Sequence, residues 1–302
     1  MYSLAVDIYH NMLIPFFASS KNTEMDINKL KSTLLLAVVV AATCSWKHIE
    51  MNSEAISSRS LDSSIRDNQK SGYEVPKIIR KGVPSQLLER FSYKTSYNRE
   101  TRTPNWVGWA LISEHTDGEY ARKGHSFIED LDVPLPRAIP ADIRESECGY
   151  QRGHMCPAGD NKWSYKAQKD AFLMTNICPQ NGNLNQHDWK YLEEACREWA
   201  KKYGKIYIVA GPIFYSNKYK TVGERKVAVP DAFFKVVLRI GKTSETTKAI
   251  GFIYANQTGH HKMNYYVCSV DDVEEATGMD FFYQLDDKTE NQIERESNLN
   301  EW

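Results

Sequence analysis

Five short runs of β-branched and aromatic residues, each bounded by turn-forming residues, follow one another along the later two thirds of the chain. They cover residues 106–112, 205–210, 233–240, 249–254 and 265–270. Runs of this length and composition are typical of strands in a packed sheet. Helical patterns occur near residues 163–173, 185–203 and 271–277. The alternation predicts an α+β fold in which helices flank a central, mostly antiparallel sheet.

The clearest helical pattern begins at Asn185, runs to Tyr203 and is followed by Gly204, a natural helix terminator. Its apolar residues recur at three- and four-residue steps: Trp189, Leu192, Ala195 or Cys196, Trp199 and Tyr203. Glu193 and Arg197 are four residues apart and so share one face. In a single helix Asn185 would lie roughly 80° around the axis from Glu193. The pattern therefore predicts that both side chains serve one site.

A second stretch, residues 150–160, places Arg152 two residues before His154. Histidine has an unperturbed pKa near 6.5, which suits a base that deprotonates water near neutral pH. The forked guanidinium of arginine suits phosphate oxygens. A hard divalent cation that keeps several waters needs few protein ligands, so the amide oxygen of Asn185 could suffice. Together these residues predict a site that cleaves phosphodiesters and slows as the pH falls through about 6 to 7.

In their order and spacing, these residues resemble the sugar-nonspecific DNA/RNA endonucleases of the ββα-metal, or His-Me finger, group, which includes secreted bacterial nucleases and endonuclease G. The family pattern is D-R-G-H, then T-N-x-x-P-Q, then N-x-x-x-W-x-x-L-E-x-x-x-R. The matching residues are Arg152, Gly153, His154, Thr175, Asn176, Pro179, Gln180, Asn185, Trp189, Leu192, Glu193 and Arg197. The resemblance runs from about Asn105 to the C-terminus. It implies a ββα-metal active-site unit on one face of the sheet.

The resemblance implies a role for each matching residue. His154 would be the general base, Asn185 the direct ligand of Mg²⁺, with Mn²⁺ as an alternative ion, and Glu193 a carboxylate that holds a water on that ion. One position departs from the family, because Gln151 stands where aspartate is usual. Glutamine keeps a carbonyl acceptor but carries no charge. We therefore expect an active enzyme in which Gln151→Asp is tolerated and Gln151→Ala is clearly worse.

The resemblance also implies that Arg152, Asn176 and Arg197 shape the catalytic site, with the two arginines binding substrate phosphate. A further family arginine lies upstream. Its best match is Arg122, although Lys123 is one residue away and is the alternative register.

The implied activity is the metal-dependent hydrolysis of both DNA and RNA, which leaves 5′-phosphate ends. Neither a recognition helix nor an RNA-binding signature occurs in the sequence, so sequence-specific reading is not expected. Residues 197–226 hold eight Lys or Arg against two Glu, and this basic run could attract a polyanion. Two alternatives stay open: a catalytically inactive nuclease-like domain that only binds, and an exported phosphodiesterase that acts on small nucleotides.

The first 44 residues are interpreted as a targeting segment, whose true start could be Met25. Lysines precede about a dozen apolar or small residues, a run too short to span a membrane. Cys44, at its end, is a candidate lipid anchor. Residues 45–104 are interpreted as a spacer and lead-in, and residues 105–302 as the nuclease domain. We therefore expect an exported protein, either secreted, periplasmic or a surface lipoprotein, with some of its five later cysteines paired.

Overall fold

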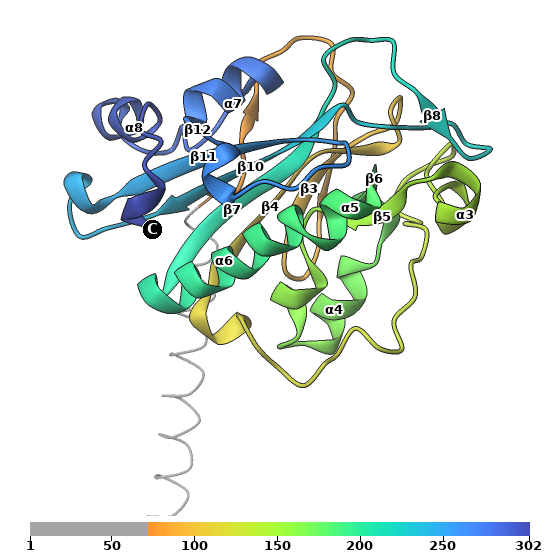
Figure 1. Ribbon diagram of the computed structural model, residues 1–302, viewed down its shortest axis with the longest axis horizontal. Helices are drawn as coiled ribbons and strands as arrows, with labels where there is room; N and C mark the ends of the chain where they lie inside the picture. The colour runs from red at the N-terminus through yellow and green to blue at the C-terminus, as the bar shows by residue number, and fades with distance from the viewer. Residues whose placement is uncertain (1–71) are drawn as a thin grey trace, which may run out of the picture. The chain divides into compact units, whose positions relative to one another are not determined.

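The computed structural model describes residues 72–302, which belong to the second of two compact units, Asn68–Trp302. Within these residues seven strands form one antiparallel sheet in the order β12-β11-β10-β7-β4-β3-β2 (Figure 1). The strands are β2 (Gln86–Glu89), β3 (Lys94–Asn98), β4 (Thr103–Ile112), β7 (Lys205–Ile213), β10 (Ala232–Arg239), β11 (Lys248–Ala255) and β12 (Val267–Cys268). Helices cover both faces of this sheet, so the predicted α+β class is confirmed.

The remaining described elements are short ladders and helices. Two-stranded ladders pair β1 (Lys77–Ile78) with β13 (Met279–Asp280), β5 (Gln151–His154) with β6 (Ile177–Gln180), and β8 (Thr221–Val222) with β9 (Val227–Ala228). The helices are α3 (Glu145–Cys148), α4 (Tyr165–Ala171), α5 (Gly182–Gln186), α6 (Asp188–Tyr203), α7 (Val270–Thr277) and α8 (Asp287–Ile293).

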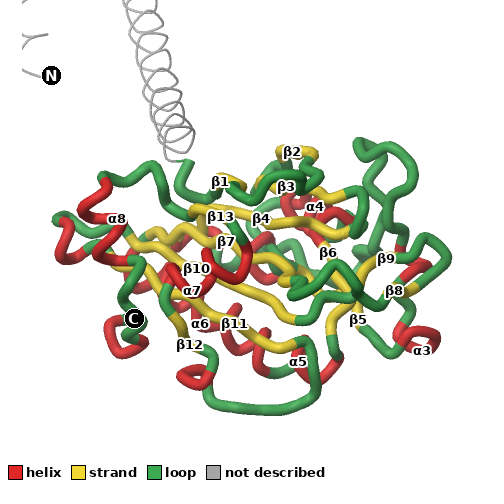
Figure 2. Tube along the Cα trace, turned by 90° about the horizontal axis from the view of Figure 1, so that it is seen from above, coloured by secondary structure: helices red, strands yellow, loops and turns green. Residues whose placement is uncertain are grey.

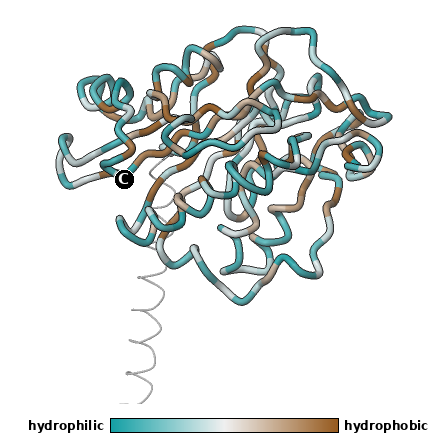
Figure 3. Tube along the Cα trace, viewed as in Figure 1, coloured by the Kyte–Doolittle hydropathy of each residue, from teal (hydrophilic) through white to brown (hydrophobic). Residues whose placement is uncertain are grey.

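Both faces of the sheet are buried, because successive side chains of a strand point to opposite sides. On β10, Phe233 and Val237 pack into the core shared with α6, whereas Phe234 and Val236 pack into the core shared with α7 and α8. Figure 1 shows α6 on one side of the sheet and α7 with α8 on the other, and the hydrophobic segments in Figure 3 concentrate in the strands between them. This two-sided burial explains why the strands appear in the sequence as nearly continuous apolar runs.

The predicted helix over residues 185–203 is wrong as a single helix, because the chain breaks at His187. That residue has φ −122° and ψ −90°, which ends α5 and begins α6. The next residue, Asp188, is buried and accepts hydrogen bonds from the backbone N–H of His261 and the hydroxyl of Tyr266. These partners come from a distant loop and hold the first turn of α6. The angle calculated between Asn185 and Glu193 for one continuous helix therefore does not apply.

The sheet also begins earlier, and one strand is shorter, than the sequence pattern predicts. Strands β2 and β3 pair with each other and with β4, so the sheet extends ahead of residue 105, where the nuclease domain was expected to begin. Of the predicted strand 265–270, only Val267–Cys268 is extended. Ser269 caps α7 with its hydroxyl, and the chain turns into that helix at Val270.

Residues 113–204 form one long excursion between two neighbouring strands. Its ends meet, since Ile112 pairs with Lys205 across β4 and β7, and Ser113 N–H donates to the carbonyl of Gly204 at 2.8 Å. The excursion contains α3, β5, α4, β6, α5 and α6. In Figure 2, β5 and α3 lie at one end of the domain, while α8 and the C-terminus lie at the other.

The targeting segment, the candidate lipid anchor at Cys44 and most of the predicted spacer lie outside the described residues. No helix within residues 72–302 is both long and apolar enough to cross a membrane. The expectation of disulfides is contradicted, because the five cysteines of the described part are all unpaired: Cys148, Cys156, Cys178, Cys196 and Cys268. Cys156, Cys178 and Cys196 instead contribute small apolar side chains to the core that α6 shares with the sheet.

Candidate active site

A cavity of about 840 Å³ opens on the excursion. It gathers six of the seven site residues that the sequence predicts, and these are Arg122, Arg152, His154, Asn185, Glu193 and Arg197. The seventh, Asn176, is fully buried and does not line the cavity. These six residues bring three guanidinium groups, one imidazole, one carboxylate and one amide to the cavity wall, which also includes Glu145 and Gln151.

His154 is the last residue of β5, and its ring lies between two aromatic side chains. The ring centroids of Phe127 and Phe172 are each 5.2 Å from it. Burial, and then the positive charge of Arg122, lowers the pKa of His154 to about 3. The imidazole is therefore neutral across the physiological range and always has a nitrogen able to accept a proton. Packing thus lowers the pKa of His154 below the range of pH 6 to 7 over which the sequence predicts a loss of activity.

Local packing explains the Arg-Gly-His sequence around this base. Gly153 pairs with Cys178 across the β5–β6 ladder, and a Cβ at position 153 would lie 2.1 Å from Oε1 of Gln180. Only glycine allows that approach. On the other side, the indole N–H of Trp189 in α6 donates to the carbonyl of His154 at 3.2 Å. The base is thus held by a ladder and a helix together.

Asn176 uses its whole amide to fix the loop that follows the base. Its Oδ1 accepts from Cys156 N–H at 2.9 Å, and its Nδ2 donates to the carbonyls of Cys156 and Ala171, both at 2.8 Å. All three bonds are internal to the protein. The structure therefore places Asn176 as a residue that shapes the site rather than one that faces substrate.

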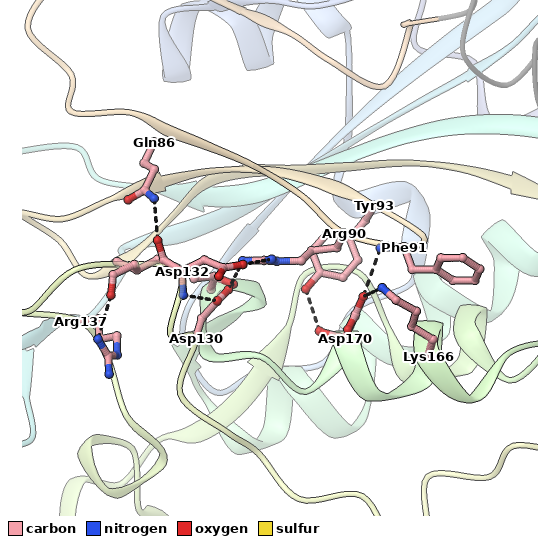
Figure 4. Close-up of polar contacts among 11 residues, drawn as sticks. Gln86, Arg90, Phe91, Tyr93, Asp130, Asp132, Arg137, Lys166 and Asp170 are labelled. Atoms are coloured by element: carbon pink, nitrogen blue, oxygen red, sulfur yellow. Dashed lines mark hydrogen bonds and ion pairs between the residues drawn. The ribbon is translucent and has the colours of Figure 1, made fainter.

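A polar network that includes Arg90, Asp130 and Asp132 lies between the turn after β2 and the loop behind the base (Figure 4). Arg90 donates to the carboxylates of Asp130 and Asp132, each at 2.6 Å. Asp130 is buried and also accepts from the hydroxyl of Thr175 at 2.6 Å. Since Thr175 directly precedes Asn176, the loop behind the base is anchored to the turn between β2 and β3.

Asn185 faces the cavity from α5 and is oriented by its neighbours. Its Nδ2 donates to Oε1 of Gln151 at 2.8 Å. Gln151 in turn donates through Nε2 to Oε1 of Glu145 in α3, at 2.9 Å. The amide nitrogen of Asn185 is thus used within the protein, which makes Oδ1 the atom suited to a cation.

Glu193 lines the cavity from α6 beside a buried lysine. Burial raises the pKa of Glu193 to about 7, against the opposing positive charges of Lys235 and Arg197. Lys235 is completely buried on β10, with Nζ 4.5 Å from the ring centroid of Trp189 and 5.3 Å from that of Trp109. Within the described residues its ammonium group has no hydrogen-bond partner. A buried cation that does not line the cavity therefore favours the charged form of Glu193.

Arg197 is fixed by a buried aspartate. Its guanidinium donates to Asp160 at 2.9 Å, and Asp160 also accepts from the indole N–H of Trp109 at 3.1 Å. Gly159 leaves room for this pair, because a Cβ there would lie 2.7 Å from the guanidinium. Arg197 therefore reaches the cavity with a defined orientation.

The other two arginines approach from different sides. Arg152 donates through Nε to the carbonyl of Ile143 at 2.8 Å, and its guanidinium lies 5.0 Å from the ring centroid of Phe127. Arg122 is exposed, with its guanidinium 5.7 Å from the ring centroid of Phe172. Lys123 does not line the cavity, so the structure favours Arg122 of the two registers.

Sequence reasoning missed three residues that complete the site: Glu145, Asp160 and Lys235. Lys235 had a detectable signal, because it interrupts the apolar face that Phe233 and Val237 define on β10. The other two had none, since their roles depend on partners 6 and 37 residues away.

Several proteins named as nucleases are similar to this chain. Nuclease C1 of Cunninghamella echinulata var. echinulata is 38% identical over 223 residues, covering 69% of this chain and 87% of that protein. The zebrafish (Danio rerio) mitochondrial nuclease EXOG is 35% identical and covers 71% of this chain and 67% of its own length. Human mitochondrial endonuclease G is 36% identical and covers 53% of this chain and 58% of its own length.

A solved structure gives the same result. A crystal structure of the EndoG/EndoGI complex, which concerns the mechanism of EndoG inhibition, matches with a TM-score of 0.61 and 27% sequence identity. The match covers 70% of this chain and 92% of that one. The ββα-metal class that the sequence predicts is therefore confirmed at the level of the fold.

The expectation of export is contradicted by these relatives. The similar nucleases of zebrafish, human, fission yeast (Schizosaccharomyces pombe) and budding yeast (Saccharomyces cerevisiae) are all named as mitochondrial. The expectation depended on a short apolar run after two lysines, a pattern that does not by itself define the destination of a protein. The expectation of export was also linked to paired cysteines, and the five described cysteines are unpaired.

The match to a family model covers most of the chain. Residues 74–288 fit the model for DNA/RNA non-specific endonucleases. This range begins just before β1 and ends within α8, so it includes the whole sheet and the whole excursion that carries the cavity. The chain therefore belongs to the DNA/RNA non-specific endonuclease family of hydrolases.

Proposed function

We propose that this protein hydrolyses the phosphodiester backbone of both DNA and RNA with the help of a divalent cation, Mg²⁺ or Mn²⁺, and leaves 5′-phosphate ends. The observation that carries the proposal is the neutral imidazole of His154 in a cavity that three arginines share with Asn185 and Glu193. This set of groups suits the phosphate backbone of a nucleic acid, and contacts to that backbone carry no information on base identity.

The residues of the cavity fit a hard divalent cation. Such ions prefer oxygen ligands, and Mg²⁺ usually keeps several waters. Asn185 would hold the ion through Oδ1, because its Nδ2 is already bonded to Gln151. Glu193 would hold a water bound to the ion. A bound divalent cation would stabilise negative charge on the phosphate and on the leaving oxygen.

The side chains of the protein perform the other parts of the reaction. His154 accepts a proton from the attacking water through its imidazole, which burial keeps neutral in the free protein. Arg152, Arg197 and Arg122 bind the non-bridging oxygens of the phosphate. Asn176 and Trp189 keep the base in place through backbone contacts on either side of it.

Digestion of supercoiled plasmid and of a long RNA, with and without EDTA, tests the proposal. We expect both substrates to be degraded, the activity to stop with EDTA, and excess Mg²⁺ or Mn²⁺ to restore it. Ligation of the DNA products without prior kinase treatment would establish 5′-phosphate ends.

Two results would contradict this function. Binding of plasmid without cleavage under any metal condition would indicate a catalytically inactive binding domain. Cleavage of a dinucleotide at a rate equal to or above that of long duplex would indicate a phosphodiesterase for small nucleotides.

A further inference from the structure

Three side chains from separate elements form a hydrogen-bonded line that ends in the cavity. Glu145 comes from α3, Gln151 from the start of β5 and Asn185 from α5. The two bonds of the line measure 2.9 Å and 2.8 Å. All three residues also line the cavity. The arrangement therefore connects the helix α3 to the residue proposed to bind the cation.

The direction of this line follows from its first residue. An ionised carboxylate can only accept hydrogen bonds, whereas each amide both donates and accepts. Facing Glu145, Gln151 must present its NH₂ group, which turns its oxygen toward Asn185. Asn185 must then present its own NH₂ group to Gln151. The acceptor at one end thus leaves the oxygen of Asn185, rather than its nitrogen, available at the other end.

The backbone around the line is shaped to accommodate it. Gly149 has φ +77°, a left-handed conformation that suits glycine, and it ends α3 so that the chain returns as β5 next to Glu145. Gly182 leaves the space in between, because a Cβ there would lie 3.0 Å from both Glu145 Oε1 and Gln151 Nε2. Two glycines thus permit the contact between Glu145 and Gln151.

We propose that Glu145 is a positioning residue which, through Gln151, fixes the amide of Asn185 with its oxygen toward the cation. The inference rests on the proposed function, since it presupposes a cation at Asn185. It also assigns a role to Gln151, which passes the hydrogen-bond direction set by Glu145 on to Asn185. In this protein the negative charge is on Glu145, one hydrogen bond beyond position 151, where the family usually has aspartate.

A charge-swapped pair of residues tests the inference. In Glu145→Gln the new amide can donate or accept, so either orientation of Gln151 and Asn185 becomes possible. We expect the affinity for Mn²⁺, measured by calorimetry on the protein without nucleic acid, to fall about tenfold, at the lower end for residues that support a metal ligand. Adding Gln151→Glu to that variant restores an acceptor next to Asn185. The double variant should return to within about twofold of the natural protein, as expected for coupled positions.

Glu147→Gln is the matched control, because Glu147 lies on the same helix and pairs with Arg144 rather than with the line. Its Mn²⁺ affinity should equal that of the natural protein. Equal affinity in Glu145→Gln, or a double variant as weak as the single one, would overturn the inference. If the natural protein binds no Mn²⁺, or if Asn185→Ala binds it equally well, the proposed metal site itself is wrong. The two failures are therefore distinguishable.

Discussion

Glu193 is half-buried and Glu294 is buried, and burial raises the pKa of both carboxyl groups, but their surroundings differ. Glu193 lies near two cations, Lys235 and Arg197, which partly oppose the effect of burial, and its pKa is about 7. Glu294, at the end of α8, has its pKa raised to about 9, first by burial and then by the surrounding carboxylates, of which Glu274 has the largest effect. The comparison teaches that burial alone favours the neutral acid. A buried carboxylate that must ionise near neutral pH needs cations built into the fold around it.

The largest predicted effect is on the rate of DNA cleavage and concerns His154, which lines the cavity together with Glu193. His154→Ala should lower the rate of DNA cleavage by about 10²–10⁴-fold, the usual contribution of a general base. His125→Ala is the control, because His125 stacks on the same Phe172 ring but does not line the cavity. Steady-state cleavage and thermal melting of both variants provide the measurement. An active His154→Ala enzyme would exclude this residue as the base.

Removing Glu193 should have the next largest effect. Glu193→Ala should reduce metal-dependent activity by about 10–100-fold, as is typical for groups that support a bound metal ion. Because its pKa is about 7, protons compete with the cation, so the natural protein should bind Mn²⁺ more weakly as the pH falls below 7. Calorimetry at pH 6 and pH 8 checks this.

The matched control for Glu193 is Glu194→Ala. Glu194 is adjacent but exposed and pairs with Lys190 at 3.6 Å. It should change neither the activity nor the pH dependence of binding. If Glu193→Ala and Glu194→Ala changed activity and Mn²⁺ binding equally, Glu193 would have no specific role at the metal site.

For Glu294, which does not line the cavity, we predict an effect on the stability of the protein and none on its activity. The pKa of Glu294 is raised from 4.5 to about 9, so between these values the folded state holds a proton that the unfolded state releases. The free energy of unfolding should therefore fall as the pH rises from about 5 to 9. Glu294→Gln should remove much of this loss and stabilise the protein at pH 9 by about 1–3 kcal/mol, with nuclease activity unchanged.

Thermal melting across this pH range provides the measurement, with about 2–4 °C expected for each kcal/mol in a domain of this size. Glu275→Gln, an exposed neighbour on α7, is the control and should leave the pH profile unaltered. A flat profile in the natural protein would contradict the raised pKa.

The smallest predicted effect distinguishes two adjacent cations. Arg122→Ala should lower kcat/KM by roughly fivefold, since an exposed charge contributes at most about 1 kcal/mol. Lys123→Ala should change it less, because only Arg122 lines the cavity. Cleavage kinetics at low and moderate salt test the pair. A larger loss in Lys123→Ala would favour the other register.

Elements whose structure depends on neighbouring residues in the chain could be predicted from the sequence. The runs at 233–240 and 249–254 became β10 and β11 with small changes at their ends, because both of their faces are buried. The helix break at His187 could not be predicted, since it depends on contacts of Asp188 with residues 72 to 78 positions later in the chain.

The same distinction applies to the candidate site. Motif spacing brought six of the seven expected residues to one cavity, but Asn176 uses its amide internally. The lowered pKa of His154 could not be inferred from the sequence, because it depends on Phe127 and Phe172 packing around the ring and on Arg122 nearby. Residue identity can be recognised from sequence, whereas the electrostatic environment requires the fold.

The excursion of residues 113–204 leaves the sheet and rejoins it at one point, where Ser113 bonds to Gly204. A segment whose two ends meet can be exchanged without changing the connections of its host. The excursion of a similar nuclease could therefore be transplanted onto this sheet as a cassette. Contacts across the boundary limit such an exchange. Trp109 donates to Asp160 and Tyr266 donates to Asp188 of the cassette, and the charge of Lys235 on the sheet acts on Glu193 there. A chimera would need to carry position 235 along with its new excursion.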